Sequence, residues 1–387
     1  SWPQYFNVGY AQFFIVNYES LKKYFVQTIP GSAKKLHSRE ILMTPNAELF
    51  KSVLIDESHR CKDTTTQQAK LSLRMAHRKQ WRILLTGTPV VNKPNDLWSQ
   101  ICIMGHSALF GGTHRAFKDR YCDGGTGASN LRELNYLLNK HCFFRREKKD
   151  VAKDLPSKDR QLILCELTNR DEYDFAEQHF KLWLQSQNLS AEQIDNALRG
   201  EVMVQMQKLK AIAAKGKMNE VKEFVEEVLE SGEKLILFCN LHAIVDSCLE
   251  LWPEAVTITG RDETQQRQRN IDRFQTDPKC QLIICNIKAA GVGITLTASS
   301  RVAFIEYPWT YADCVQCEDR AHRIGQTLPV MCSYFMGAKS IDEYMWEIIN
   351  EKREVSSIIT GATDTMETST VDNRGQVDKI LNLFKNK

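Results

Sequence analysis

Short runs of apolar residues recur along the chain, and each ends in a polar or motif-like residue. Five runs predict strands, at residues 52–55, 83–85, 235–238, 282–285 and 302–305. Because the runs are apolar throughout rather than alternating, they predict strands of parallel sheets that helices cover on both faces. Ligands of such sheets bind at the carboxyl ends of the strands. The pattern therefore predicts an α/β protein whose functional residues follow its strands.

A periodicity of 3.6 residues predicts helices between these strands. The clearest apolar stripe has five members: Val221, Phe224, Val225, Val228 and Leu229. Another helix is predicted to start near Thr264 and to bury Ile271 and Phe274. Residues 171–215 are rich in Gln, Lys and Glu and carry no strand signal, so they predict a helical elaboration between two sheets.

A chain of 387 residues has room for two or three domains. The main boundary is predicted in the basic run 145–149 and the stretch that follows it, which the helix-breaking Pro156 closes. The predicted divisions are 1–155, a linker with helical elaboration at 156–215, 216–360, and a polar tail at 361–387. In that tail Val377, Ile380, Leu381 and Phe384 form a short amphipathic stripe. The stripe is predicted to dock back onto the body, with a partner-binding helix as the alternative.

Composition narrows the possible classes of protein. With 42% apolar and 26% charged residues and a net charge of +3, the chain is an ordinary globular protein, so any nucleic-acid surface must be a local patch. Twelve scattered cysteines indicate reduced thiols inside a cell. Cys314 and Cys317 have CxxC spacing, but without a second pair they predict two small residues on a helix face rather than a zinc site. No apolar run is long enough to span a membrane.

An acidic pair follows the first predicted strand. Asp56 could orient Mg²⁺ through water and Glu57 could polarise an attacking water, which suits nucleotide hydrolysis, although acidic dipeptides are usually just solvated. The next strand ends in Thr86-Gly87-Thr88-Pro89, either a plain turn or a pair of hydroxyls at the same rim. His59 would link the two motifs; alone, a structural histidine would be the alternative.

Two further motifs follow the later strands. Gly291 and Gly293 come after the strand at 282–285, where glycines let backbone amides approach a phosphate, although a packing turn is the default. Arg320 and Arg323 are three residues apart and share one face if the segment is helical. Their planar guanidinium groups can grip phosphate oxygens, whereas the alternative is a solvated basic face.

Together and in this order, the motifs resemble the SWI/SNF-like ATPases of helicase superfamily 2, over about residues 10–360. Matching segments are 16–19 (early DNA contact), 56–59 (Walker B), 85–89 (coupling), 117–122 and 144–158 (the exit from the first lobe), and 237–240, 288–298 and 316–326 (second lobe). The His-Arg-Ile-Gly-Gln ending at 322–326 is the most specific. Ser58 and the Thr-Leu-Thr-Ala at 295–298 favour the annealing-helicase (HepA-related) branch. The sequence differs from that of nucleosome remodellers at three places: Ile287, Ala290 and the Trp-Thr at 309–310.

The resemblance implies two RecA-like lobes with parallel sheets flanked by helices, the first lobe incomplete and helical insertions added. Residues 1–155 would be the C-terminal part of lobe 1, and 216–360 would be lobe 2. It also implies ATP, Mg²⁺ and duplex or branched DNA as ligands. Implied catalytic residues are Asp56 (which also holds Mg²⁺ through water), Glu57, Arg320 and Arg323. Implied ATP-binding or coupling residues are His59, Thr86, Gly87, Thr88, Gly291, Gly293 and Gln326. Implied DNA-binding residues are Asn17, Tyr18, Asn240, Lys288, Thr295, Thr297 and Gln316.

The family's P-loop, Gly-x-x-x-x-Gly-Lys-Thr, does not occur in the sequence. We therefore expect a fragment of a longer DNA translocase, involved in strand annealing or fork remodelling during DNA repair, that alone does not turn over ATP. The alternatives are an RNA helicase of the same superfamily and a non-catalytic DNA-binding or scaffold protein. An intracellular location is expected: the nucleus in a eukaryote, the cytoplasm or nucleoid in a prokaryote or virus.

Overall fold

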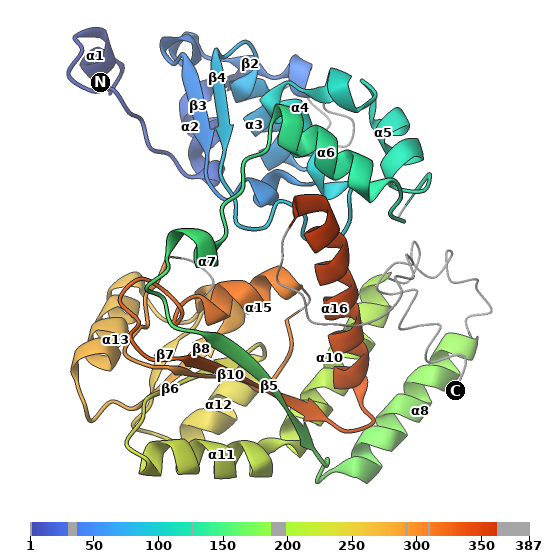
Figure 1. The fold of residues 1–387 in the computed structure, drawn as a ribbon, viewed down its shortest axis with the longest axis vertical. Helices are drawn as coiled ribbons and strands as arrows, with labels where there is room; N and C mark the ends of the chain where they lie inside the picture. The colour runs from blue at the N-terminus through green and yellow to red at the C-terminus, as the bar shows by residue number, and fades with distance from the viewer. Residues whose placement is uncertain are drawn as a thin grey trace. The chain divides into compact units, whose positions relative to one another are not determined.

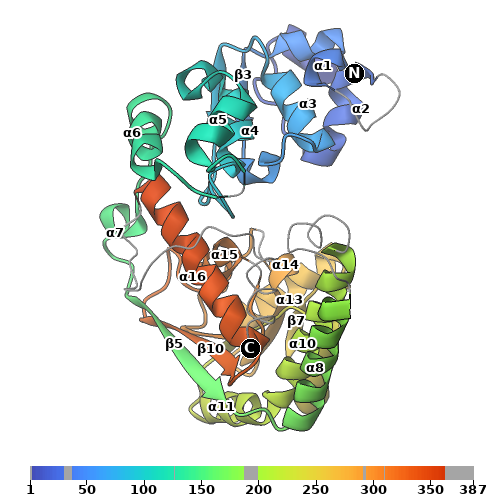
Figure 2. The ribbon, with the colours of Figure 1, turned by 90° about the vertical axis from the view of Figure 1, so that its right-hand side faces the viewer.

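The computed structural model describes residues 2–29, 37–125, 127–186, 199–290, 293–308 and 310–361. The chain divides into two compact units (Figures 1 and 2). Among the described residues, unit 1 comprises those up to Arg145 and those from Glu354 on, and unit 2 comprises those from Arg146 to Arg353. The first crossing lies inside the predicted basic run. The predicted tail helix lies outside the described residues.

Unit 2 is built on a six-stranded sheet of parallel strands in the order β5-β10-β9-β6-β8-β7. Its strands are β5 (Lys158–Cys165), β6 (Leu235–Cys239), β7 (Val256–Ile258), β8 (Leu282–Asn286), β9 (Arg301–Phe304) and β10 (Val330–Gly337). Its helices are α7 (Lys148–Val151), α8 (Arg170–Ser186), α10 (Arg199–Gly216), α11 (Met218–Glu230), α12 (His242–Leu251), α13 (Thr264–Thr276), α14 (Ile287–Ala290), α15 (Tyr311–Glu318) and α16 (Ile341–Thr360), the last of which continues into unit 1.

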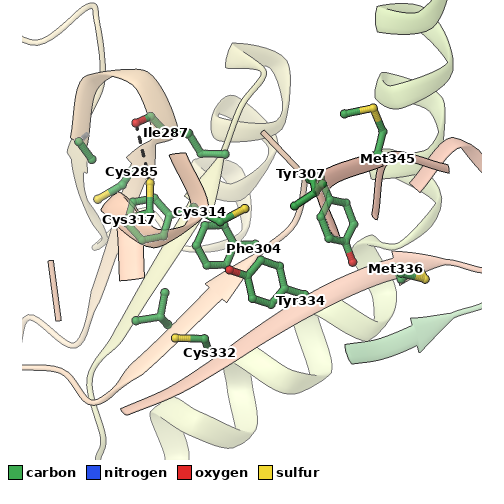
Figure 3. Close-up of a cluster of buried hydrophobic side chains, with 14 of the residues drawn as sticks. Cys285, Ile287, Phe304, Tyr307, Cys314, Cys317, Cys332, Tyr334, Met336 and Met345 are labelled. Atoms are coloured by element: carbon green, nitrogen blue, oxygen red, sulfur yellow. Dashed lines mark hydrogen bonds between the residues drawn. The ribbon is translucent and has the colours of Figure 1, made fainter. Parts of the chain in front are cut away.

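Helices cover both faces of this sheet. Every residue of β6 is buried, and successive residues alternate between two cores. Ile236 and Phe238 face a core built with α8, α10, α13, α15 and α16, whereas Leu235, Leu237 and Cys239 face α11 and α12. In the first core Phe304 stacks on Tyr334 with ring centroids 4.4 Å apart (Figure 3). The predicted two-sided burial is therefore confirmed for unit 2.

The helical predictions are confirmed in unit 2, with one change of role. The apolar stripe of α11 packs into the core, and Phe274 of α13 is fully buried. Helices α8 and α10 contribute core residues such as Tyr173 and Met206, so they belong to unit 2 rather than forming an elaboration outside it. Strand β5, directly before them, was missed because its first four residues are polar.

Unit 1 has less sheet and more irregular structure in its described part. Its strands are β1 (Val26–Thr28), β2 (Leu42–Met43), β3 (Ser52–Ile55) and β4 (Trp81–Leu84). Its helices are α1 (Trp2–Asn7), α2 (Leu21–Phe25), α3 (Gln67–Ala76), α4 (Asp96–Met104), α5 (His114–Tyr121) and α6 (Leu131–His141). Strands β1 and β2 pair antiparallel, and β3 and β4 pair parallel.

The β3–β4 pair is covered on one face only by described residues. Ile55 packs in a small core with residues of α3 and α4. On the other face Leu54 is paired with Ile83, and the two are 59% and 48% exposed. The prediction of two-sided burial is therefore wrong for these strands in the described part of unit 1. The α/β class is as predicted.

Helix α16 is the second place where the chain passes between units. Its later residues Val355 and Ile359 lie in the core of unit 1, and Asn135 Nδ2 donates to the Ile359 carbonyl at 2.8 Å. All twelve cysteines are free thiols, and Cys314 and Cys317 are buried in the unit 2 core. Within the described ranges, no helix is both long and apolar enough to cross a membrane.

Candidate functional site

The acidic pair lies directly after β3, as predicted. Glu57 adopts a left-handed backbone conformation (φ 49°), and its amide donates to Asp56 Oδ1 at 3.0 Å. The side chain of Glu57 is 47% exposed. A non-glycine residue in this conformation carries a backbone cost, which makes such positions worth examining as functional sites. The turn presents a solvent-accessible carboxylate at the end of a strand.

His59 connects the acidic pair to the next motif. Its Nδ1 lies 3.0 Å from Thr86 Oγ1 and 3.2 Å from Glu57 Oε2. The backbone joins the same two segments, because the Ser58 amide donates to the Leu85 carbonyl at 3.0 Å. His59 therefore lies between the two motifs, in the linking position predicted from the sequence. Thr88 contributes its amide to Thr86 Oγ1 at 3.1 Å, which closes the turn around Gly87.

Gln100 of α4 is part of this site and was missed from sequence. Ser58 Oγ donates to Gln100 Oε1 at 2.9 Å, and Gln100 Nε2 donates to the Pro89 carbonyl at 2.8 Å. The buried side-chain amide of Gln100 is thus hydrogen-bonded to both the acidic turn and the Thr-Gly-Thr-Pro turn. A polar residue in the otherwise apolar end of a helix was the available signal, because buried amides need hydrogen-bond partners.

Residues 16–19, the predicted early DNA-contact segment, contact the acidic turn through Tyr18. Its hydroxyl donates to the Asp56 carbonyl at 2.7 Å, and the Arg60 guanidinium lies 5.0 Å from its ring centre. Burial raises the pKa of Tyr18, so the hydroxyl stays protonated as a donor. Asn17 caps the short helix that follows by accepting from the Ser20 amide at 3.0 Å. The predicted DNA-contact residues are therefore physically tied to the acidic pair.

In unit 2 the two arginines converge on one acceptor. Helix α15 ends at Glu318, so Arg320 and Arg323 lie in the turns after it rather than on a helix face. Their Nη1 atoms nevertheless donate to the same Ile294 carbonyl, at 3.3 and 3.2 Å. Gly293, the preceding residue, has φ 66°, a value that suits glycine. Gly291 lies outside the described residues.

Gln326, predicted as an ATP-binding or coupling residue, has a buried side chain. It is 6% exposed, and its Nε2 lies within hydrogen-bond distance of three carbonyls, those of Thr297, Ser299 and Ala321. Its side chain therefore braces the arginine-bearing turns against the loop after β8, and any part in ATP binding would be indirect.

Of the remaining predicted residues of unit 2, Asn240 follows the carboxyl end of β6 and Lys288 lies just after β8. Asn286 Nδ2 donates to the Asn240 carbonyl at 2.8 Å, and the amide of Asn240 donates to Glu306 Oε2 at 3.0 Å. Glu306 is buried, which raises its pKa, and sequence reasoning gave it no role although it ends an apolar run. Lys288 is exposed at the start of α14. Thr297 Oγ1 accepts from Gln275 at 3.3 Å, whereas Thr295 and Gln316 are half-buried.

Comparison with known protein families decides the family. Residues 10–242 match the model of the SNF2-related domain. The chain belongs to the SNF2-related family. A second match, to the helicase conserved C-terminal domain, covers residues 216–325 of this SNF2-related chain and includes both arginines. The family resemblance read from the motifs is confirmed.

Curated relatives of this SNF2-related chain include named annealing helicases. The mouse (Mus musculus) DNA annealing helicase and endonuclease ZRANB3 is 32% identical over 375 residues, covering 89% of this chain and 34% of that protein. The Caenorhabditis elegans SWI/SNF-related matrix-associated actin-dependent regulator of chromatin subfamily A-like protein 1 homolog is 30% identical, covering 83% and 47%. The chain thus spans about a third to a half of these relatives' lengths.

One solved structure similar to this SNF2-related chain is the Sulfolobus solfataricus SWI2/SNF2 ATPase core in complex with dsDNA. It is 26% identical, covers 80% of this chain and 69% of that one, and has a TM-score of 0.43.

Proposed function

We propose that this chain is the greater part of the motor of an ATP-dependent translocase that moves along duplex or branched DNA. The observation that carries the proposal is the convergence of Arg320 and Arg323 on one carbonyl beside a glycine turn, in a chain whose other unit presents an accessible acidic pair. Arginine forks paired with acidic residues that hold Mg²⁺ are components of phosphoryl-transfer sites. Named annealing helicases among the relatives support annealing or fork remodelling in DNA repair as the purpose.

Each group has a definable task in that reaction. ATP would supply the phosphoryl group, and Mg²⁺ would neutralise part of the negative charge on its phosphates. Asp56 would hold Mg²⁺ through water, and Glu57 would orient the attacking water. A change at the acidic pair would be transmitted to Thr86 through His59, which contacts both Glu57 and Thr86. Arg320 and Arg323 would bind the phosphate oxygens on which negative charge develops. The donor sets fit these tasks, because the carboxylate is accessible and the forks are oriented together.

DNA contact would come from residues at the ends of the same elements. Asn17 and Tyr18 sit next to the acidic turn, Asn240 and Lys288 lie just after β6 and β8, and Thr297 lies in the loop before β9. Amides, hydroxyls and lysine suit phosphate contacts, which carry little base specificity. We therefore expect affinity to fall steeply with salt and to depend little on sequence.

The direct test uses the protein produced from its complete gene. Glu57→Gln should abolish turnover while sparing ATP binding, because it removes only the catalytic carboxylate. Arg323→Ala should lower kcat by about 10³-fold or more if the guanidinium acts as a finger. Turnover is measured with duplex DNA, forked DNA and RNA in parallel. Stimulation by RNA alone would favour an RNA helicase. Near-normal turnover of a variant would remove its residue from the mechanism, and absence of turnover in the wild type would point to a scaffold.

The 387-residue chain by itself gives a second test. Because its sequence contains no P-loop, we expect residues 1–387 alone to bind ATP weakly and to show negligible DNA-stimulated turnover. Robust hydrolysis by this chain would contradict that expectation. An intracellular location, nuclear in a eukaryotic source, belongs to the same proposal.

A further inference from the structure

The segment that enters unit 2 is bonded to the arginine-bearing turns. We call residues 146–157 the connector and residues 318–323 the arginine segment. Lys148 Nζ lies 2.7 Å from Asp319 Oδ1 and donates to the His322 carbonyl at 3.1 Å. His322 Nε2 in turn lies 2.9 Å from the Pro156 carbonyl. The connector is therefore attached at both of its ends to residues that flank Arg320 and Arg323.

A buried charge cluster lies beneath these contacts. Glu318 is fully buried, and its carboxylate lies 2.9 Å from Lys158 Nζ and accepts both guanidinium bonds of Arg160, at 2.5 and 2.7 Å. The Tyr334 hydroxyl donates to the same carboxylate at 2.7 Å. Burying a carboxylate is costly unless it is paired and hydrogen-bonded, so these bonds specify one position for Glu318. Lys158 and Arg160 are in β5, the strand that follows the connector.

The second passage between the units is tied to the same place. The Arg353 guanidinium lies 5.4 Å from the centre of the Tyr311 ring, and that of Arg160 lies 5.6 Å from it. Tyr311 is the first residue of α15, whose last residue is Glu318. Arg353 is 6% exposed and is the residue at which α16 leaves unit 2. The two places where the described chain passes from one unit to the other therefore both contact α15 or the arginine segment directly.

We propose that Lys148, Lys158 and Arg160 are positioning residues. They hold the arginine segment in a position that depends on the position of the connector. A displacement of the connector would move Asp319 and His322, and with them Arg320 and Arg323. A change in the position of the connector would then place or withdraw the arginines, which would couple the state of the connector to hydrolysis. We call the contacts of Lys148 with Asp319 and His322, and of His322 with Pro156, the clamp. This inference rests on the proposed function for its catalytic meaning, while the clamp itself can be tested without ATP.

The exposed end of the clamp offers the cleanest variant, because the Lys148 side chain is 44% exposed and folding should survive its removal. In the complete protein, Lys148→Ala should lower kcat roughly 10- to 100-fold, the loss expected of a misplaced catalytic group, with the KM for ATP nearly unchanged. The matched control is Glu233→Ala, which removes an ion pair to Arg301 at 3.0 Å, also in unit 2 and 38% exposed. The double variant Lys148→Asp with Asp319→Lys swaps the two charges of the ion pair, so it should restore part of the lost kcat.

Hydrogen–deuterium exchange of the 387-residue chain measures the clamp independently of catalysis. Lys148→Ala should speed amide exchange in residues 318–326, and Glu233→Ala should not. Faster exchange in this chain, combined with a lack of ATPase activity in the complete wild-type protein, would support the clamp while removing the proposed function. Unchanged exchange together with unchanged kcat would overturn the inference. Lowered thermal stability with normal kcat would also overturn it, because the contacts would then be structural only.

Discussion

The two parallel sheets of this molecule both carry motif residues near strand ends but are covered differently. The acidic pair follows the carboxyl end of β3, whereas the arginine segment is bonded to the start of β5. In unit 2, β6 and β8 are buried at every position between two cores. In the described part of unit 1, β3 and β4 bury one face and expose Leu54, Trp81 and Ile83 on the other. The arginine segment thus rests on a fully packed layer, whereas the acidic pair rests on a half-covered one.

The difference shows how each motif is held in place within its own unit. The acidic turn is held by a few polar contacts, chiefly through His59, Tyr18 and Gln100. The arginine segment is held by buried ion pairs on a dense core. Packing determines position most firmly where side chains interlock on both faces. We therefore expect unit 2 to be the more stable unit, and mutations can test that.

The largest effect is expected in the core of unit 2. Phe304→Ala removes a fully buried ring stacked 5.0 Å from Phe238 and 4.4 Å from Tyr334. The free energy of unfolding of unit 2 should fall by about 3–5 kcal/mol. Hydrogen exchange of the amides in β6 and β8 measures this change. A loss below 1 kcal/mol would mean that the core is not tightly packed.

Acid should weaken unit 2 through Glu318. Burial raises the pKa of this carboxyl, but Lys158 and Arg160 outweigh burial and lower it to about 2. Because the folded pKa lies below the ordinary value, the stabilisation is complete above about pH 4.5 and is lost as pH falls toward 2, a change of about 3 kcal/mol. Urea unfolding at several pH values measures it. Glu318→Gln should flatten this dependence, and an unchanged slope in that variant would assign the effect to other carboxyls.

A smaller effect is expected on the covered face of unit 1. Ile55→Ala empties a site that is 7% exposed, against α3 and α4. The small cluster can collapse in part, so the cost should be about 2 kcal/mol, at the low end for such substitutions. Hydrogen exchange of the β3 and β4 amides reports this loss. A cost equal to that of Phe304→Ala would contradict the difference drawn between the units.

The smallest effect is expected one residue earlier. Leu54→Ala changes a side chain that is 59% exposed, so stability of the 387-residue chain should change by no more than about 0.5 kcal/mol. The same exchange measurement applies, with Ile55→Ala as the internal reference. A large loss at Leu54 would show that its face is covered in solution.

Much of the fold could be predicted from local pattern. The strands at β3, β4, β6, β8 and β9 and the helices α11 and α13 follow from apolar runs and stripes. Strand β5 could not, because Lys158 and Arg160 occupy positions that only partners elsewhere in the chain make suitable for a strand. The coverage of β3 and β4 also escaped prediction, because a uniformly apolar run does not reveal whether both of its faces have neighbours.

The sequence by itself determined the family, because the acidic pair, the Thr-Gly-Thr-Pro turn and the His-Arg-Ile-Gly-Gln ending depend on residue type and order alone. It also placed His59 between two motifs. Only the tertiary structure decided that Arg320 and Arg323 meet at the Ile294 carbonyl, that Gln326 is an internal brace, and that the connector is bonded to the arginine segment. Those facts depend on distances between residues far apart in the chain, which hydrogen bonds and burial fix and local sequence does not encode.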